Sequence, residues 1–555
     1  MNTARSGIRS PSVESGPRSA RRGRAATVAA VAALLLVPLA ARAIATGSPW
    51  ALIGLPLESL VAVILIVAVS GRRTRAIVAG VFAVVIVAGL LVALLDAAFA
   101  ATIGRPFDIA EDATAIGSAV SVVSDAAGAV TAWLAVALLL ALLALAGYGL
   151  ARAALRVGRA AGRTGLVVVT AIALTWILAA LTGTASAPSV ARAGAITIAR
   201  ADAIAVLAAT GQRTAQTIAD RAEFERELAT DDLRDALPPD ALAALAGKDV
   251  VLAFVESYGR VALEERADMA GIAEVLREGE AQLRAAGFDA RSGFLTSPTF
   301  GGVSWLAHAT LQSGFRVDAQ PEYDHLLTTE RLTLSRLFSD AGWRTVGVVP
   351  SNTEPWPAGQ GFYGFDAVFD ATSMGYAGPP FGYARVPDQF TWAFLHDREL
   401  AAGGPVMAEV DLVSSHTPWT PLPELVPWEE VGDGSVFAGQ LDGQPSSLEV
   451  WTDADRVRAH YARSIQYALG TVFSYLDTLA EPDLVLVLVG DHQPATIVSG
   501  DDAGRDVPVT VIARDPAVIE RIEGWGWDAG LHPSADAPVW RMDEFRDRFV
   551  EAFSP

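Results

Sequence analysis

An acid and an imidazole follow directly after the apolar run LVLVLVG, residues 484–490. The run is too short to cross a membrane, and it predicts a strand buried on both faces of a parallel sheet. Asp491 and His492 then stand at the carboxyl end of that strand, which is where ligands bind in open α/β sheets. The pair could equally be a turn aspartate and a surface histidine, so the other strand ends decide between the two interpretations.

Three further polar side chains stand at comparable places. Glu256 ends a strand predicted over 250–257, and His416 follows one predicted over 404–413. Ser304 comes after a glycine-rich turn and begins a predicted helix, where backbone N–H groups and the helix dipole favour an anion such as phosphate. Carboxylate and imidazole ligands together suit Mn²⁺, Mg²⁺ or Zn²⁺. We therefore expect a metal site beside an anion site at one edge of the sheet.

Strands and helices alternate through the second part of the chain. The pattern predicts a mostly parallel sheet covered by helices on both faces. The predicted strands cover residues 250–257, 344–350, 404–413, 484–489 and 507–513, and the predicted helices cover 268–286, 331–343, 455–480 and 542–553.

Five apolar stretches in the first part have about the 20 residues that a membrane helix needs. Arginine-rich segments favour the cytoplasmic side, so 1–25, 71–75 and 151–165 belong inside and the acidic loop 97–127 belongs outside. Five crossings from an inside N-terminus then place the chain after about residue 186 outside the cytoplasm. The five stretches are 26–45, 50–70, 76–95, 130–150 and 165–185.

These observations predict an α-helical membrane domain followed by an α/β domain. The chain divides into four regions. We expect a cytoplasmic basic tail (1–25), a five-helix transmembrane domain (26–185), a helical juxtamembrane linker (186–247) and an extracytoplasmic catalytic domain (248–555). Glu58 lies within the second span. An acid there is a candidate functional group, although its carboxylate could also reach the membrane interface.

The charge of the chain is divided sharply. Residues 1–190 carry 15 arginines and 7 acidic residues, which leaves 27 of the 42 basic and 55 of the 62 acidic residues for the rest. So acidic a region lacks the basic footprint of a nucleic-acid-binding protein. The chain has no cysteine, which excludes disulfides, thiolate metal ligands and a cysteine nucleophile.

The order of these motifs resembles that of the alkaline phosphatase/sulfatase superfamily. FVES, the glycine-rich turn TFGGVS, SSHTPW and GDH carry the resemblance, which spans roughly residues 249–515. Membrane helices ahead of an outward-facing domain are similar to the lipoteichoic acid synthase-type phosphoglycerol transferases of that superfamily. The resemblance implies one divalent metal ion, Mn²⁺ with Mg²⁺ or Zn²⁺ as alternatives, and its ligands would be Glu256, Ser304, Asp491 and His492.

The same resemblance implies roles in substrate binding. His416 would contact the substrate and protonate the leaving group, and Trp356 in SNTEPWP would line a phosphate pocket. The arginine that follows this tryptophan in the family is absent here. His308 would lie one turn on from Ser304 on the same helix face, where it could touch the substrate phosphate or be an ordinary helix histidine.

Two spacings select Ser304 as the nucleophile. TFGGVS resembles the family pattern Thr-x-x-Gly-x-Thr, and Gly314 stands ten residues after Ser304, as a glycine does after the nucleophile of sulfatases and nucleotide pyrophosphatases. Thr299 is the reserve candidate, because threonine is the usual nucleophile of the transferase family.

The implied function is a membrane-anchored phosphotransferase that works through a phospho-serine or phospho-threonine intermediate. It would move a phosphoglycerol-type head group from a membrane lipid such as phosphatidylglycerol to a cell-envelope glycolipid or polymer. Alternatives are a phosphoethanolamine transferase and a phosphatase or phosphodiesterase, the latter with a second metal ion at Asp411, His416 and His532. A sulfatase is disfavoured because SWLAH lacks the proline and arginine of the sulfatase motif. An inactive binding relative is disfavoured by the complete metal-ligand set.

The arginine distribution makes a topological prediction. Reporter fusions placed in the loop 97–127 and after Pro555 should report an extracytoplasmic location, and a fusion at 151–165 should report a cytoplasmic one. A fusion after Pro555 that is active only in the cytoplasm would contradict the whole interpretation.

Overall fold

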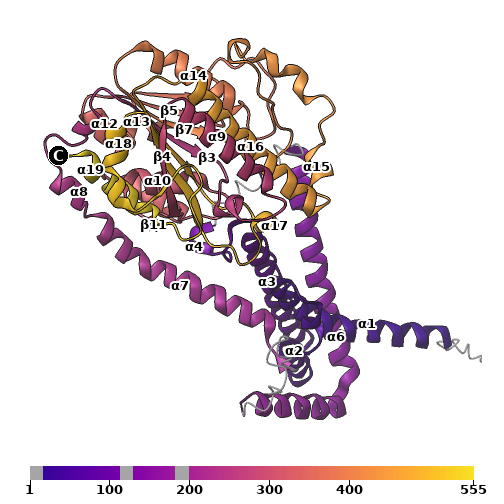
Figure 1. Ribbon diagram of the computed structural model, residues 1–555. Coiled ribbons are helices and arrows are strands. Elements are labelled where there is room, and N and C mark those ends of the chain that lie inside the picture. The colour runs from indigo at the N-terminus through magenta and orange to yellow at the C-terminus, as the bar shows by residue number, and fades with distance from the viewer. Residues whose placement is uncertain (1–16, 113–119, 121–128, 182–198) are drawn as a thin grey trace, which may run out of the picture. The chain divides into compact units, whose positions relative to one another are not determined.

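The computed structural model describes residues 17–112, 120, 129–181 and 199–555 (Figure 1). The chain forms two compact units. The first comprises Met1–Ala98, Pro106–Ile109 and Ala119–Gln216, and the second comprises Phe99–Arg105, Ala110–Ser118 and Thr217–Pro555.

The first unit is built from long apolar helices. Three segments are long and apolar enough to cross a membrane, namely 21–44, 72–103 and 129–161. They belong to α1 (Pro17–Thr46), α3 (Arg72–Ile103) and α6 (Ala129–Leu181), while α2 (Leu57–Ala68) is a shorter apolar helix.

Five spans are therefore not confirmed. The predicted second span is replaced by a short 3₁₀ helix, a two-residue strand β1 (Leu55–Pro56) and α2. The arginine-rich segment 151–165, expected between the fourth and fifth spans, is instead part of the continuous helix α6. Its five alanines, four arginines and one leucine are good helix formers, and no proline interrupts them. Residues 1–16 of the tail, most of the loop after residue 112 and residues 182–198 lie outside the described part of the chain.

The carboxylate of Glu58 binds the start of another helix of the same unit. Its Oε1 accepts hydrogen bonds from the backbone N–H groups of Ala203 (3.0 Å) and Ile204 (3.4 Å). These two residues belong to the first turn of α7 (Asp202–Leu228). An acid at a helix N-terminus satisfies free N–H groups and complements the helix dipole. Beside this contact, β1 pairs in parallel with β2 (Ala199–Arg200).

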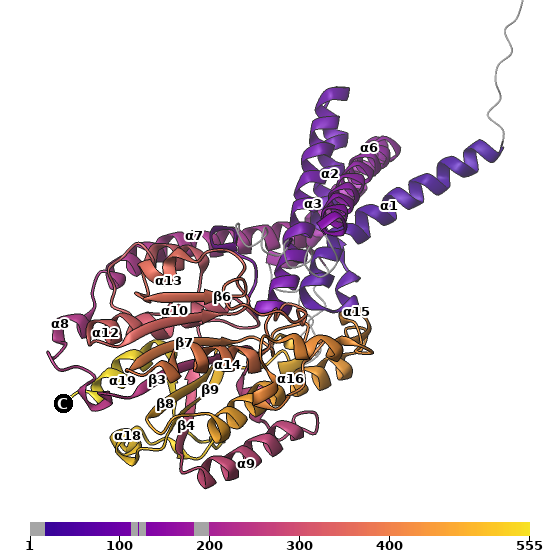
Figure 2. The ribbon, with the colours of Figure 1, turned by 90° about the horizontal axis from the view of Figure 1, so that it is seen from above.

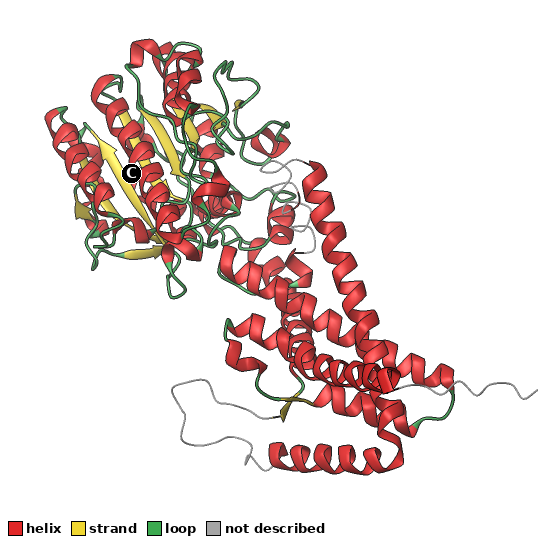
Figure 3. Ribbon diagram, turned by 90° about the vertical axis from the view of Figure 1, so that its right-hand side faces the viewer, coloured by secondary structure: helices red, strands yellow, loops and turns green. Residues whose placement is uncertain are grey.

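The second unit is an α/β domain around a nine-stranded sheet (Figure 3). The strand order is β10-β4-β9-β8-β3-β7-β5-β6, and β11 pairs with β4. The strands are β3 (Asp249–Val255), β4 (Asp289–Thr296), β5 (Arg344–Val349), β6 (Ala367–Asp370), β7 (Val406–Leu412), β8 (Leu484–Gly490), β9 (Asp506–Ala513), β10 (Asp528–Ala529) and β11 (Val539–Arg541).

The sheet is mixed rather than mostly parallel. Strands β8, β3, β7, β5 and β6 pair in parallel, whereas β9 runs antiparallel to both β8 and β4. The apolar run of β9 marks a buried strand but carries no information about its direction. Strand β4 was missed because its sequence, DARSGFLT, alternates weakly and begins with polar residues.

Helices cover both faces of this sheet (Figure 2). Alternate residues of β3 point to opposite faces, so Val251 and Val255 pack in one core and Leu252 and Phe254 in the other. The first core is closed by α9 (Ala270–Ala285), α14 (Asp388–Arg398) and α16 (Ala454–Thr478), and the second by α10 (Ser304–Ser313), α12 (Leu334–Asp340), α18 (Pro516–Arg521) and α19 (Phe545–Phe553).

The predicted helices of the α/β domain are confirmed to within a few residues at their ends. In α9 the buried positions Ile272, Leu276, Gly279 and Leu283 form one helical stripe, which explains why the sequence pattern was sufficient. The remaining short helices are α4 (Ile109–Asp112), α8 (Asp232–Ala236), α11 (Gln320–Leu326), α13 (Pro357–Gly361), α15 (Ser447–Val450) and α17 (Thr496–Ser499).

Candidate active site

Two neighbouring parallel strands bring the first three polar residues together. Strand β3 ends immediately before Glu256, and β8 ends immediately before Asp491 and His492. The register pairs Val255 with Gly490, so both strands end at the same level. The acids and the imidazole are therefore adjacent although they lie far apart in the sequence.

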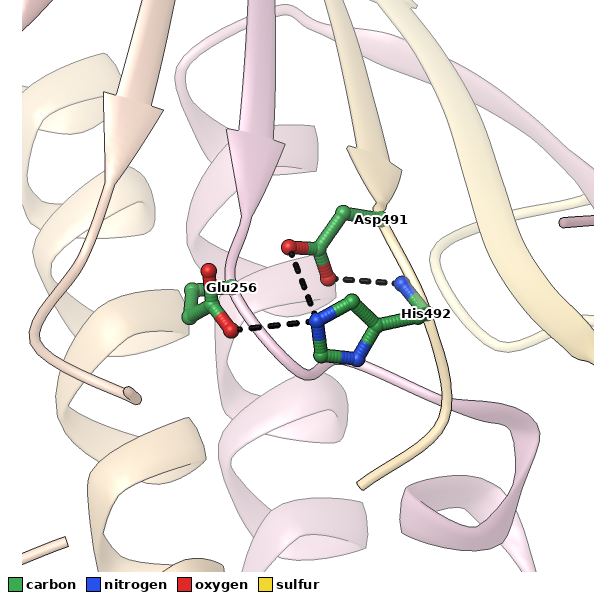
Figure 4. A group of neighbouring side chains, drawn as sticks. All are labelled: Glu256, Asp491 and His492. Atoms are coloured by element: carbon green, nitrogen blue, oxygen red, sulfur yellow. Dashed lines mark hydrogen bonds and ion pairs between the residues drawn. The ribbon is translucent and has the colours of Figure 1, made fainter. Parts of the chain in front are cut away.

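The three side chains converge on a common point (Figure 4). His492 Nε2 lies 3.3 Å from Glu256 Oε1 and 3.6 Å from Asp491 Oδ2. Asp491 Oδ1 also accepts hydrogen bonds from the backbone N–H groups of Ser257 (2.7 Å) and His492 (2.6 Å). All three residues are buried, with exposed fractions of 8% for Glu256 and 1% for the other two.

Burial and the short distances between these charged groups shift their pKa values. Burial, together with the charge of Glu256, raises the pKa of Asp491 to about 7. Burial alone would lower the pKa of His492, but Asp491 and Glu256 raise it to about 9. Burial opposes ionisation of Glu256 as well, yet the charges of His416 and His492 hold the pKa of Glu256 below its usual range.

Ser304 completes the group from the helix side. Its hydroxyl donates to Glu256 Oε2 (2.8 Å), and its Oγ lies 3.2 Å from His492 Nε2. The chain reaches this position through Gly301 and Gly302 and then Val303, which has a left-handed backbone (φ 57°). Ser304 is the first residue of α10, so its hydroxyl lies beside free N–H groups at a helix N-terminus.

The reserve candidate Thr299 has different neighbours. Its Oγ1 lies 3.4 Å from Ser297 Oγ, and its backbone N–H donates to the same oxygen. Ser297 in turn donates to the carbonyl of Asp491 (2.6 Å). Thr299 thus belongs to the turn that supports the site, and the hydroxyl that contacts both Glu256 and His492 is that of Ser304.

His416 lies on the loop that follows β7. Two hydrogen bonds hold this loop. The hydroxyl of Ser415 donates to the carbonyl of Glu256 (2.6 Å), and the indole of Trp419 donates to the carbonyl of Ser415 (2.8 Å). The ring of His416 stacks on Tyr383, with centroids 3.7 Å apart. Tyr383 could not be predicted as a neighbour of His416, since a lone tyrosine in a loop belongs to no motif.

Trp356 and His308 stand in different surroundings. Trp356 precedes α13 and packs against Tyr363 and Phe365, with ring centroids 5.0 and 6.4 Å apart. His308 is buried on α10, where its ring stacks on Phe254 with centroids 3.7 Å apart.

The residues near Asp411 also differ from those expected for a second metal ion. His308 lies near Asp411 and Glu409, whereas His532 lines a surface hollow with residues such as Glu264 and Glu280. Glu409 was missed from the sequence, although an acid in the middle of the apolar strand VMAEVDLV is an indication of a buried polar contact.

The donor set at the strand ends fits a divalent cation. Two carboxylates, an imidazole nitrogen and a serine oxygen are the ligand types that Mn²⁺, Mg²⁺ and Zn²⁺ take in proteins. The ligand atoms of Glu256, Asp491 and His492 lie within 4.8 Å of one another and are shielded from water. Two buried acids with one histidine leave excess negative charge, which a cation would neutralise.

No family model and no curated protein matches the chain. Several solved structures do. The lipoteichoic acid synthase LtaP from Listeria monocytogenes is 14% identical with a TM-score of 0.37, and the match covers 56% of this chain and 74% of that one. The phosphoglycerol transferase GacH from Streptococcus pyogenes, solved with sn-glycerol-1-phosphate, is 12% identical with a TM-score of 0.37, covering 60% and 81%.

A third similar structure is that of an integral membrane protein. The lipooligosaccharide phosphoethanolamine transferase EptA from Neisseria meningitidis, an integral membrane protein, is 10% identical with a TM-score of 0.45, and the match covers 90% of this chain and 95% of that one. These proteins are of the classes that the sequence motifs resemble.

The geometry of the site predicts that Glu256 and Asp491 are both required for metal binding. Glu256→Ala or Asp491→Ala should abolish turnover and weaken binding of a divalent ion by more than the ~10–100-fold typical of residues that only support a ligand. Elemental analysis of the purified full-length chain would measure the bound metal.

A matched control lies at the other end of the same strand. Asp249 begins β3 and accepts a hydrogen bond from the backbone of Val406, so Asp249→Ala should keep the metal. Near-normal metal content in Glu256→Ala would show that the ligand assignment is wrong.

Proposed function

We propose that the chain is a membrane-anchored, metal-dependent phosphotransferase with Ser304 as its nucleophile. The observation that carries the proposal is the contact of the Ser304 hydroxyl with Glu256 and His492 at the start of α10. The proposed substrate is a membrane phospholipid with a phosphoglycerol-type head group, and the proposed acceptor is a glycolipid or polymer of the cell envelope.

An ordinary helix-capping serine would be arranged differently. A capping side chain accepts a hydrogen bond from the second or third N–H of its helix. In α10 the capping position is Val303, no side chain caps the helix, and the Ser304 hydroxyl donates to a buried carboxylate instead. The hydroxyl is therefore directed at the acidic group, as a nucleophile beside a metal ion requires.

Each group of the site would have its own role in the first displacement. When bound by Glu256, Asp491, His492 and Ser304, a divalent ion would lower the pKa of the serine hydroxyl and polarise the phosphoryl group. Ser304 Oγ releases its proton to solvent and attacks the phosphorus, and the bond from phosphorus to the diacylglycerol oxygen breaks. The N–H groups at the start of α10 face the phosphoryl oxygens and stabilise their charge.

The diacylglycerol then leaves the site, and the acceptor binds in its place. His416 protonates the departing diacylglycerol oxygen, which leaves a phospho-serine at position 304. An acceptor hydroxyl gives its proton to the now neutral His416 and attacks that phosphorus, and the bond to Ser304 Oγ breaks. Ser304 Oγ then regains a proton from solvent. A covalent intermediate lets the lipid product leave before the acceptor binds, so one site serves two bulky substrates in turn.

The long apolar helices are evidence that the substrate is a lipid. Three segments of the chain are long and apolar enough to cross a bilayer, and an anchored domain stays at the surface where the lipid head groups are presented. With phosphatidylethanolamine as donor the same residues would transfer phosphoethanolamine, and with water as acceptor the chain would be a hydrolase.

We expect activity toward glycerophospholipids and none toward aryl sulfates. Purified protein in vesicles that contain head-group-labelled phosphatidylglycerol should release unlabelled diacylglycerol and pass the label to an acceptor. The position of the label, measured by chromatography, separates a transferase from a hydrolase, since a hydrolase would leave it in water-soluble glycerol phosphate. Rapid hydrolysis of sulfate esters without cleavage of phosphodiesters would reverse the assignment.

Ser304→Ala should reduce turnover by at least about 10³-fold while the protein stays folded and metal-loaded, because nucleophile removal eliminates the covalent route. The matched control is Ser313→Ala at the other end of α10, which should retain most activity. Steady-state release of diacylglycerol provides the measurement. If Ser304→Ala is active and Thr299→Ala is not, the nucleophile is Thr299.

A further inference from the structure

A second group of charged side chains lies beneath the nucleophile helix. Glu409 and Asp411 are two residues apart on β7, so both project from the same face of the sheet. Met407, two residues earlier, packs in the core that also contains α10, which identifies the face. His308 meets the two acids from α10, one helical turn after Ser304.

The three side chains converge as metal ligands do. His308 Nδ1 lies 3.0 Å from Glu409 Oε1 and 3.5 Å from Asp411 Oδ1, and one ligand atom of each residue lies within 4.8 Å of the others. Glu409 is 3% exposed and His308 is 9% exposed, and the side chain of Asp411 is 19% exposed. Burial of two carboxylates beside one imidazole is costly unless a cation or protons neutralise them.

The surroundings orient these side chains from outside. Gln312, one turn further along α10, donates a hydrogen bond to Glu409 Oε2 and accepts one from the backbone N–H of Ser335 (2.9 Å). The ring of His308 is fixed by stacking on Phe254. Outer contacts of this kind are typical of metal ligands, whose orientation is set by hydrogen bonds to their second polar atom.

One carboxylate oxygen of the group makes no hydrogen bond in the described part of the chain, and its charged neighbour is His308 Nδ1 at 3.5 Å. Asp411 Oδ1 is inaccessible to solvent and has no hydrogen-bond partner among the described residues. In the same part of the chain, the structure gives neither acid an ion pair with a lysine or an arginine. Burial, and then the charges of Glu409, Glu256 and Asp491, raise the pKa of Asp411 to about 7 despite the opposing effect of His308.

We propose that His308, Glu409 and Asp411 form a second divalent-cation site, separate from the one at Glu256, Asp491 and His492. One imidazole and two carboxylates suit Zn²⁺ or Mn²⁺. The two sites adjoin through the backbone, because Asp411 pairs with Phe254, two residues before Glu256, and because His308 shares α10 with Ser304. A cation at this place adds positive charge one helical turn below the nucleophile.

The competing arrangement is a protonated His308 that compensates the two carboxylates by itself. Its pKa supports that state in the absence of metal: burial would lower it, but Asp411 and Glu409 raise it to about 9. The two arrangements differ in the number of ions bound, because an imidazolium cannot be a ligand.

Counting bound zinc ions separates the two arrangements. The full-length, tag-free chain in detergent is stripped with chelator, dialysed against Zn²⁺ at pH 8, and measured by elemental analysis and titration calorimetry. The wild-type chain should bind two ions. Asp411→Asn and His308→Gln should each keep one ion at Glu256, Asp491 and His492. Each should lose affinity at the proposed second site by at least about 100-fold, since each lacks a direct ligand of that site.

Two further variants complete the design. Glu256→Ala should also bind one ion, and the double variant Glu256→Ala with Asp411→Asn should bind none. The matched control is Asp388→Asn, which changes a fully buried aspartate outside both groups and should keep two ions. A thermal melt of each variant verifies that it is folded.

Three outcomes are decisive. One zinc ion on the wild-type chain would overturn the proposal, as would two on Asp411→Asn. Two ions on Glu256→Ala together with one on Asp411→Asn would support the second site and contradict the ligand assignment on which the proposed function depends.

Discussion

The architecture depends on the burial of the Glu256 and Asp491 carboxylates side by side at the ends of two adjacent strands. Neither acid has an arginine or lysine partner in the described part of the chain, and the imidazole that lies within 4 Å of both is that of His492. Burial and then the like charge of Glu256 disfavour ionisation of Asp491, and both raise its pKa. A bound cation would offset this repulsion and take both carboxylates as ligands.

The surrounding fold holds these carboxylates in place. The parallel register of β3 and β8 brings the two strand ends level, and the Ser257 N–H fixes Asp491 from the β3 side. The loop after β7 is tied to Glu256 through Ser415. Helix α10 then presents Ser304 to the group from its N-terminal end, which no side chain caps. Electrostatics and chain topology thus combine to place a hydroxyl, two carboxylates, an imidazole and a helix N-terminus at one point.

Much of this site could be predicted because its residues stand at transitions in the sequence pattern. Glu256, Asp491 and His492 each follow an apolar run that ends abruptly, and Ser304 follows two glycines. The contact of Glu409 with His308 could not be predicted, because it joins a strand and a helix about 100 residues apart and leaves no local pattern. The antiparallel direction of β9 and the continuity of α6 through its arginines were also missed. Strand direction depends on tertiary pairing, and arginine is as good a helix former as leucine, so charge alone does not end a helix.

The central claim is that Ser304 forms a covalent bond to phosphorus. The direct measurement is mass spectrometry of the full-length protein, quenched in acid during turnover of phosphatidylglycerol in the absence of acceptor. Trypsin would release the peptide 292–316, bounded by Arg291 and Arg316, which contains both Ser304 and Thr299. The account predicts a glycerophosphoryl adduct on this peptide, with fragment ions that place it on Ser304. An unmodified Ser304 in a protein that is turning over, or an adduct on Thr299, would contradict it.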